Sequence, residues 1–428
     1  MALQSMSHRR LISLISVAWA LVLSVCAGWI APAAAQPYAA PLSPPDTAAV
    51  LRPDTLTLRT PSATAQLTPL TNRQTANRPY RQEPSVYVTA PAIRYNRVEG
   101  AVVGLQRAPL AWTDSAPVRL YGQASYALAL GTPRYLAGIE VRPTPPGARY
   151  GLKAGVHAGH TTTSADQWKQ SWEETSVSAL LFGRDLFNYY DVRQVTAYAL
   201  QRIGPGLQIS AGFRWAAHAS LARNTNWAFL ERSPFRPNPA ADAGTVRALI
   251  LSAEAGHLRP RSEHRPVGSI ARLYAELGHA FGGSLAYNRY IADGQTYRPI
   301  TASTNLNLRV RAGYATHEAP DQMRFRLNGV HGLRTFDPAR GGTRLLLGSA
   351  QLAWYDVPFA GWLQPLQLST FADAGWTGNG ALADGDAFAF AGVGAALFDR
   401  LIAVDVAWPL HRGPAWSPQV TLKIHPLR

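Results

Sequence analysis

Residues 118–130 read VRLYGQASYALAL, and their side chains alternate in character along the chain. Every second residue, beginning with Val118, is apolar or glycine, whereas the residues between them include Arg119 and Gln123. A period of two residues places one kind of side chain on each face of a β-strand. The same alternation recurs in 150–157, 207–215 and 305–314. The sequence therefore predicts an all-β protein.

The length of these segments separates two all-β architectures. A soluble sandwich turns its apolar face inward and its charged face to water, whereas a transmembrane barrel turns its apolar face to lipid. Strands of soluble proteins run to about five or six residues, and a tilted membrane strand needs about nine to eleven. The segments here run to about ten residues between clusters of Gly, Pro, Asp and Asn. We therefore predict a transmembrane antiparallel β-barrel.

Seventeen segments of this kind can be marked between 93–106 and 417–426, and they include 174–183 and 321–331. Bacterial single-chain barrels normally have an even number of strands, so one segment is expected to be false. The weakest is 283–291, followed by 93–106. The prediction is about sixteen strands, with fourteen as the alternative.

Composition excludes several other classes of protein. The chain has 428 residues, a formal net charge of +15, 47% hydrophobic residues, 16% charged residues and one cysteine. This balance is unlike a disordered chain, a coiled coil or a disulfide-rich scaffold. No run of about 20 apolar residues follows the first 30, which argues against membrane-spanning helices.

The chain divides into three parts by composition. Residues 1–35 combine a basic start at Arg9 and Arg10 with an apolar stretch and a small-residue site at 33–35, which predicts a signal peptide. The alternative is a membrane anchor. Residues 36–92 contain ten prolines and no apolar periodicity, which predicts a flexible periplasmic segment. Residues 93–428 form the predicted barrel.

Several short motifs in the last hundred residues resemble one family of barrels. Segment 329–336 reads GVHGLRTF and is similar to the loop motif of the bacterial surface antigen superfamily, the BamA/TamA-like outer-membrane barrels. Segment 371–375, FADAG, resembles the Phe-x-Asp-x-Gly strand of that family. Segments 95–100, 342–352, 392–394 and 404–410 resemble its other strands, in the family's order. The resemblance implies a loop near 329–343 that folds into the barrel lumen.

The resemblance also implies how that loop is anchored. Arg334 and Phe336 correspond to the loop tip, and Asp373 and Gly375 correspond to the inner wall that receives it. An arginine fork pairs with a carboxylate through charge-assisted hydrogen bonds, and a glycine leaves room for close backbone approach. The alternative is that Arg334 is one of many arginines in the lumen and that Asp373 is solvated.

This chain departs from the family pattern in four places. Thr335 stands where the family has glycine, and Gln351 stands where glutamate is common. The segment before the barrel is too short for the family's tandem periplasmic POTRA domains, and the final residues lack a terminal aromatic. These departures put protein-insertase activity in doubt and leave the barrel prediction unchanged.

Basic residues alternate with the apolar face, so they are predicted to line the lumen. An arginine that faces lipid near the bilayer midplane would cost about 2–4 kcal/mol. A cationic lumen favours anions, unless Glu99, Glu140, Glu254 and Glu276 neutralise it locally. The basic residues are spread over many strands rather than gathered in one exposed stripe, which argues against nucleic acid as a partner. The predicted basic lining comprises Arg119, Arg149, Lys153, Arg214, Arg272, Arg309, Arg311, Arg324 and Arg326.

A search for catalytic groups yields only weak candidates. His157 and His160 are three residues apart and would face opposite sides of a strand, which makes a poor metal pair. His218 and Ser220 share a face, but no third catalytic group can be assigned to them. A last candidate is an acidic and aromatic patch at 172–174, 185 and 189–191, which a loop beside the membrane interface also explains. We predict no catalytic residues, no metal and no cofactor.

The sequence therefore predicts a monomeric, non-enzymatic barrel in the outer membrane of a Gram-negative-type bacterium. Its expected partners are outer-membrane lipid and an unknown polypeptide or lipid cargo that it assembles or translocates. One alternative is a porin-like diffusion channel with an anion bias. A second alternative is an outer-membrane hydrolase that would depend on Ser220 or Glu174.

Overall fold

The computed structural model describes residues 90–424 apart from 113, 147, 205, 263–264, 335–340, 358–365, 381–383, 398–401 and 411–417. The predicted signal peptide and most of the predicted flexible segment lie outside these residues. The described chain consists mainly of β-strands. They are β1 (Ala90–Asn96), β2 (Gly100–Arg107), β3 (Val118–Ala127), β4 (Thr132–Val141), β5 (Tyr150–Thr163), β6 (Tyr190–Ile203), β7 (Leu207–Ser220), β8 (Gly244–Ser262), β9 (Arg265–Leu277), β10 (Asn288–Pro299), β11 (Thr304–Ala315), β12 (Arg344–Val357), β13 (Leu366–Gly378), β14 (Asp386–Leu397), β15 (Ile402–Pro409) and β16 (Gln419–Ile424).

The described parts of the connections contain three short helices: α2 (Trp172–Phe182), η1 (His279–Phe281) and η2 (Asp321–Met323). None of the helices in the described ranges is long and apolar enough to cross a membrane.

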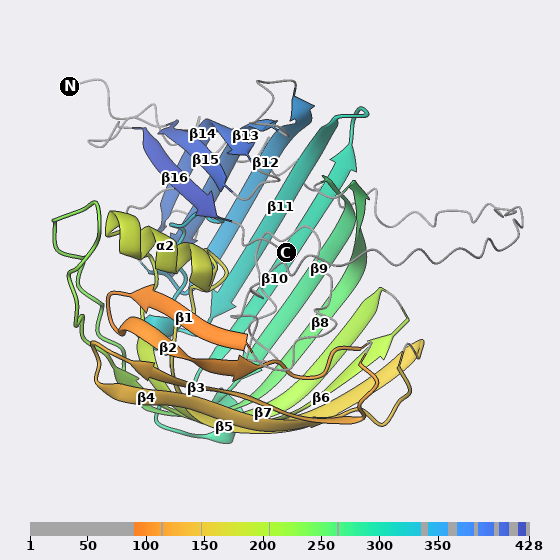
Figure 1. The fold of residues 1–428 in the computed structure, drawn as a ribbon, viewed down its shortest axis with the longest axis vertical. Coiled ribbons are helices and arrows are strands. Elements are labelled where there is room, and N and C mark those ends of the chain that lie inside the picture. Colours follow the sequence, from red (N-terminus) through yellow and green to blue (C-terminus); the bar gives the residue numbers. More distant parts are fainter. Residues whose placement is uncertain are drawn as a thin grey trace, which may run out of the picture. The chain divides into compact units, whose positions relative to one another are not determined.

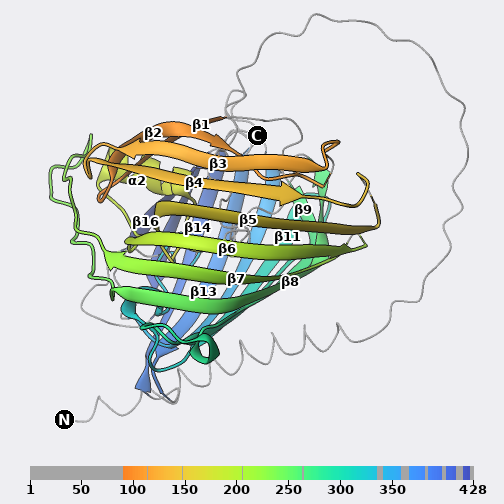
Figure 2. The same ribbon diagram turned by 90° about the horizontal axis from the view of Figure 1, so that it is seen from below.

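The sixteen strands form one sheet in sequence order, and each strand pairs antiparallel with its neighbours in the chain (Figures 1 and 2). This confirms the predicted all-β antiparallel fold and the strand number of sixteen. β1 and β16 are the two edges of the sheet. Because consecutive strands reverse direction, every connection that follows an odd-numbered strand lies at the same end of the sheet. The long loops 164–189, 221–243 and 316–343 therefore share one end.

Exposure along the strands is the reverse of that in a soluble protein. On β3, Leu120 is 65% exposed, whereas its neighbour Tyr121 is 4% exposed. On β10 and β11, Asp293 and Arg311 are buried while Tyr290 and Tyr314 on the other face are exposed. Apolar side chains thus cover the outer face and polar ones are enclosed, which is the arrangement of a membrane barrel. Exposed apolar area of this extent is unusual for a soluble monomer.

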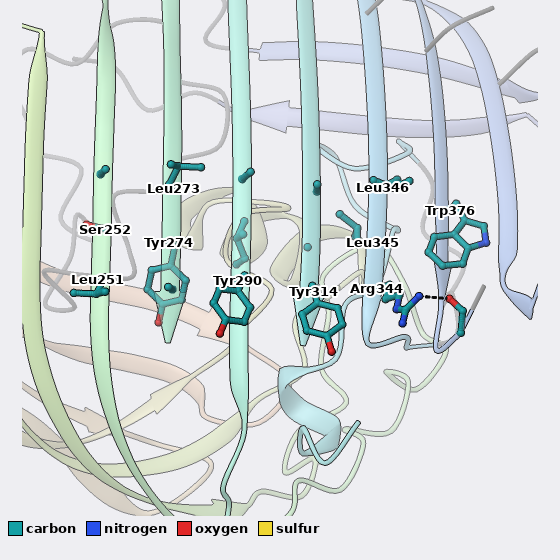
Figure 3. Close-up of a pocket in the computed structure, with 17 residues that line it drawn as sticks. Leu251, Ser252, Leu273, Tyr274, Tyr290, Tyr314, Arg344, Leu345, Leu346 and Trp376 are labelled. Carbon is teal, nitrogen blue, oxygen red and sulfur yellow. Dashed lines mark hydrogen bonds between the residues drawn. The ribbon is translucent and has the colours of Figure 1, made fainter. Parts of the chain in front are cut away.

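The outer face carries an apolar groove across β8 to β13 (Figure 3). Leu251, Leu273 and Leu346 lie along it, and the rings of Tyr290 and Tyr314 stack at a centroid distance of 6.2 Å. Each strand contributes alternate residues to this surface, so the groove follows from the period-two pattern.

Four expectations about individual strands are corrected. Segment 174–183 is not a strand, because it lies within helix α2. Segment 321–331 is also not a strand, since it begins with the short helix η2 and continues as loop. Segment 93–106 contains two strands, β1 and β2, which are joined by a tight turn at 97–99. Segment 283–291, expected to be false, contains the start of the genuine strand β10 at Asn288.

Candidate functional site

The described residues of the loop 316–343 between β11 and β12 fold back against the inner face of the sheet. Phe325 and Gly342 form an isolated antiparallel bridge, which joins the middle of the loop to its last residues. Beyond the bridge, Leu327, Val330 and Leu333 are almost fully buried. Apolar burial of this kind holds a loop that would otherwise be solvated. The loop is thus part of the interior of the sheet.

Arg334 connects this loop to two strands of the wall. Its Nε lies 3.1 Å from Oδ2 of Asp373 on β13, and its Nη1 lies 3.4 Å from Oδ2 of Asp405 on β15. The guanidinium carbon stands 3.5 Å from the ring centroid of Phe371, which shares a face with Asp373. Arg334 has a φ of 55°, in the left-handed region that non-glycine residues seldom adopt. Two buried carboxylates therefore converge on one buried guanidinium at a strained backbone position.

Gly375 is one of the positions where the loop packs closely against β13. A Cβ atom at this position would lie 2.8 Å from Cδ2 of Leu327 and 3.2 Å from Cδ2 of Leu333. The close approach therefore involves loop side chains rather than loop backbone. Phe336 and Thr335 lie outside the described residues. Gln351, at the position of the family's glutamate, accepts a hydrogen bond from Asn307 at 3.4 Å.

A second junction joins this loop to the loop 164–189 between β5 and β6. The ammonium of Lys169 donates to Oδ1 of Asn328 at 2.9 Å and pairs with Asp166 at 2.9 Å. The backbone N–H of His331 donates to the carbonyl of Lys169, and Nε2 of His331 lies 3.4 Å from Oε2 of Glu174. Burial lowers the pKa of Lys169 to about 8, although Asp166 partly opposes the shift. The two loops therefore form one buried polar junction.

Helix α2 follows directly from this junction and begins with a capping box. The N–H of Glu174 donates to Oγ of Ser171, and the N–H of Ser171 donates to the Glu174 carboxylate. Gly183 ends the helix in the left-handed conformation. The helix residues that face the protein are mixed in polarity: Trp172, Glu174, Thr175, Ser178 and Ala179 are buried.

The segment that contains α2 contacts both edges of the sheet (Figure 1). The backbone N–H of Tyr95 on β1 donates to Oγ of Ser176 at 3.0 Å. Arg184, just after the helix, donates to the backbone carbonyl of Val420 on β16 at 3.1 Å. Edge strands present unpaired backbone groups that can pair with another chain. The α2 segment engages such groups on both edges at once.

Most of the predicted basic lining lies next to carboxylates. Arg309 and Arg311 both pair with Asp293, Arg214 pairs with Glu276, and Lys153 lies 3.7 Å from Glu140. Paired charges of this kind neutralise part of the predicted cationic lumen. Within the predicted basic lining, Arg119 also pairs with Asp114, Arg272 with Glu254 and Arg326 with Asp321.

Three residues of that predicted lining lie off the strands. Arg149 is exposed in the turn before β5, where its guanidinium packs over the ring of Tyr150, so it does not line an inner wall. Arg324 and Arg326 belong to the loop 316–343. The alternation in 321–331 predicts a strand, whereas both arginines are half-buried residues of a loop.

The weak catalytic candidates have ordinary structural partners. His157 contacts the hydroxyl of Tyr121, whereas His160 contacts Asp191, so the two histidines belong to different clusters. Nδ1 of His218 lies 3.4 Å from the amide of Gln322, and Oγ of Ser220 accepts from the backbone of Ala241. Within the described ranges, no group of three or more His, Cys, Asp and Glu side chains could hold a metal ion.

Comparisons with known proteins bear on the fold. Residues 67–263 match the C-terminal domain of a family of unknown function, DUF5686. Among curated proteins, none matches this chain.

Solved barrel structures are similar to this chain at low sequence identity. BamA from Haemophilus ducreyi lacking POTRA domains 1–3 has a TM-score of 0.52 at 13% identity, over 79% of this chain and 70% of that chain. CdiB from Acinetobacter baumannii has a TM-score of 0.41 at 11% identity, over 78% of this chain and 57% of that one. CdiB from Escherichia coli has a TM-score of 0.42 at 9% identity, over 80% and 62%. With the sixteen-stranded sheet and the reversed exposure, the first similarity shows that this chain has the fold of the BamA barrel.

Proposed function

We propose that this protein is a non-enzymatic outer-membrane barrel of the bacterial surface antigen type that assembles or translocates polypeptide or lipid at the outer membrane. The contact of α2 with both sheet edges carries the proposal. A diffusion pore needs only a stable wall, whereas a barrel that handles cargo gains from edges that can be covered and uncovered. The reversed exposure of the strands supports lipid as the surrounding partner.

The proposed action begins at β1 and β16. When the α2 segment is docked, it occupies backbone groups at Tyr95 and Val420. When it leaves, those groups become available to an extended segment of cargo, because an exposed sheet edge binds a strand through main-chain hydrogen bonds. The junction of Lys169 with Asn328 links this movement to the loop that Arg334 anchors.

The proposal is tested by locking α2 onto β1. Cysteines placed at Tyr95 and Ser176 can be joined by a short bis-maleimide, after replacement of Cys26, the one cysteine of the chain. In cells that lack the native gene, the unlinked pair should restore the outer-membrane protein and lipid profile, and the linked pair should not. A matched control pair at Gln123 and Ser125 lies on β3, away from both edges. Full function of the linked Tyr95–Ser176 pair would contradict the proposal.

Inward arginines favour an anion-biased channel as the second candidate function. The two functions differ in a planar bilayer. Large, steady, anion-selective current steps from the purified protein would favour the channel, whereas a closed or flickering trace would favour the cargo-handling barrel.

A further inference from the structure

An interior chamber of about 120 Å³ lies apart from the Arg334 anchor. Its walls come from the inward faces of β1 to β7, β9 and β10, together with Trp168 of loop 164–189, Trp172 of α2 and Met323 of η2. A cavity of this volume exceeds the roughly 10–15 Å³ that a single water requires. It has room for a small polyatomic ion.

Arg289 is the arginine in this chamber that has no carboxylate of its own among the described residues. It lies at the start of β10, is 7% exposed, and stands opposite Glu276 in the register of β9 and β10. Its guanidinium makes no hydrogen bond or ion pair with any residue in the described ranges. The guanidinium carbon of Arg289 lies 4.8 Å from the ring centroid of Phe325, which is a cation–π contact.

The nearby carboxylate is already occupied. Glu276 accepts hydrogen bonds from Arg214, from Tyr274 at 3.1 Å and from Tyr287 at 2.8 Å. Among the described residues of the lining, Arg214 and Arg289 therefore share one carboxylate, which leaves a surplus positive charge. A buried charge without a partner is costly, and an anion beside it removes that cost.

Neutral groups in the same walls are rich in donors. Gln194 on β6 is 6% exposed, and its amide makes no hydrogen bond with a residue of the described ranges. The hydroxyl of Thr162 on β5 is buried and is likewise without a described partner. His218 lines the chamber beside them. Glu276 is the chamber's one carboxylate in the described lining.

We propose that this chamber binds a phosphate group, either as inorganic phosphate or as the headgroup of a phospholipid. The planar guanidinium of Arg289 suits the oxygens of phosphate, which accept paired hydrogen bonds from such a fork. Gln194 and Thr162 provide neutral donors for further oxygens. The site goes beyond cargo handling at the sheet edges, since it uses neither edge strand backbone nor the Arg334 anchor.

The test uses the full chain in detergent micelles, with calorimetric titration of sodium phosphate at ionic strength matched with chloride. The native protein should bind phosphate saturably in the millimolar range or tighter. Arg289→Gln should bind at least about tenfold more weakly, the loss expected for one charge-assisted hydrogen bond. Arg272→Gln is the matched control, because Arg272 is an inward arginine that pairs with Glu254 outside the chamber. It should bind as the native protein does.

Thermal unfolding provides an independent measurement. Phosphate should raise the melting temperature of the native protein, because a ligand that binds only the folded state stabilises it. The same concentration should leave Arg289→Gln unchanged. If Arg289→Gln does not fold, Gln194→Leu replaces it and should bind phosphate severalfold more weakly. Equal binding by native protein and the folded chamber variant, or no saturable binding by native protein, would overturn the proposal.

Two further titrations identify the source of the phosphate group. Dioctanoyl phosphatidic acid that competes with inorganic phosphate in an Arg289-dependent manner would identify a lipid headgroup. Binding of inorganic phosphate without such competition would identify the free ion. Both results support the phosphate site.

Discussion

The charge at Arg334 illustrates how much one residue can hold together. Its guanidinium forms ion pairs with Asp373 and Asp405, whose side chains are 0% and 4% exposed. Removal of one partner from a buried ion pair leaves the other charge uncompensated, which costs about 3–5 kcal/mol. Here two carboxylates would be left.

Arg334→Ala is therefore expected to lower the free energy of unfolding by about 3–5 kcal/mol. Heat-induced loss of the compact band in gel electrophoresis, measured in detergent, would show the change as a lower transition temperature. Arg326→Ala is the matched control, because its carboxylate partner among the described residues, Asp321, is 42% exposed, and a carboxylate open to solvent loses less when its arginine is removed. Equal transition temperatures for the two variants would argue against an anchored loop.

Lys169 predicts a pH dependence of the same loop junction. Burial lowers the pKa of Lys169 from 10.5 to about 8, so the folded protein releases this proton at lower pH than the unfolded chain. Between pH 8 and 10.5 the unfolded state holds more protons, and this group's contribution to stability rises with pH.

The stability of the native protein relative to Lys169→Met should therefore rise as the pH increases from 8 to 10, by at most about 3 kcal/mol. Denaturant unfolding of both proteins at several pH values measures this difference. Other titrating groups are common to both proteins and cancel. A difference that stays constant or falls over this range would contradict the assigned pKa shift.

At the scale of elements, α2 departs most from the sequence prediction. Its buried side chains mix Trp172 with Glu174, Thr175 and Ser178, so no apolar stripe of helical period marks it. The available signal was local, namely the Ser171-x-x-Glu174 capping box. The strand predicted at 321–331 is wrong for a related reason: short alternation of apolar and polar residues also occurs in a loop that packs on the inner face of a sheet. Segment 283–291 was expected not to be a strand, because the start of β10 at Asn288 directly follows a glycine-rich connection.

Ser171→Ala should loosen the start of α2, because loss of an N-cap costs about 1 kcal/mol. The expected result is faster proteolysis within 164–189 and a lower yield of the Tyr95–Ser176 crosslink. Ser171→Asn is the matched control, since asparagine caps helices as well as serine. If both variants behave alike, the capping box does not hold α2 at the sheet edges.

At the scale of the whole molecule, the two faces of the sheet should respond oppositely to charge. Leu273 lies near the middle of β9 and is 58% exposed on the apolar outer face. An arginine there would cost about 2–4 kcal/mol in a bilayer. Leu273→Arg should therefore reduce the amount of folded protein recovered from outer membranes. Gln123→Arg, on the inner face of β3, should be recovered like the native protein, and equal recovery of both would argue against a lipid-facing outer surface.

The period-two pattern was enough to predict the architecture, because apolar and polar side chains alternate along each strand and so occupy its two faces. This alternation involves residues that are adjacent in the chain, so it can be recognised without knowledge of tertiary contacts. The pairing of Arg334 with Asp373 was suggested by resemblance, and the two groups lie 3.1 Å apart, but its companion Asp405 was not identified.

Which loops meet inside the sheet could not be predicted from the residue pattern and is seen only in the folded chain. Lys169 and Asn328 are 159 residues apart, and Ser176 meets Tyr95 across 81 residues. Neither contact has a local pattern, because each depends on two loops returning to the same place after many intervening strands. The surplus charge among the described residues around Arg289 arises in the same way, since Arg214 on β7 and Arg289 on β10 meet the same carboxylate, Glu276 on β9.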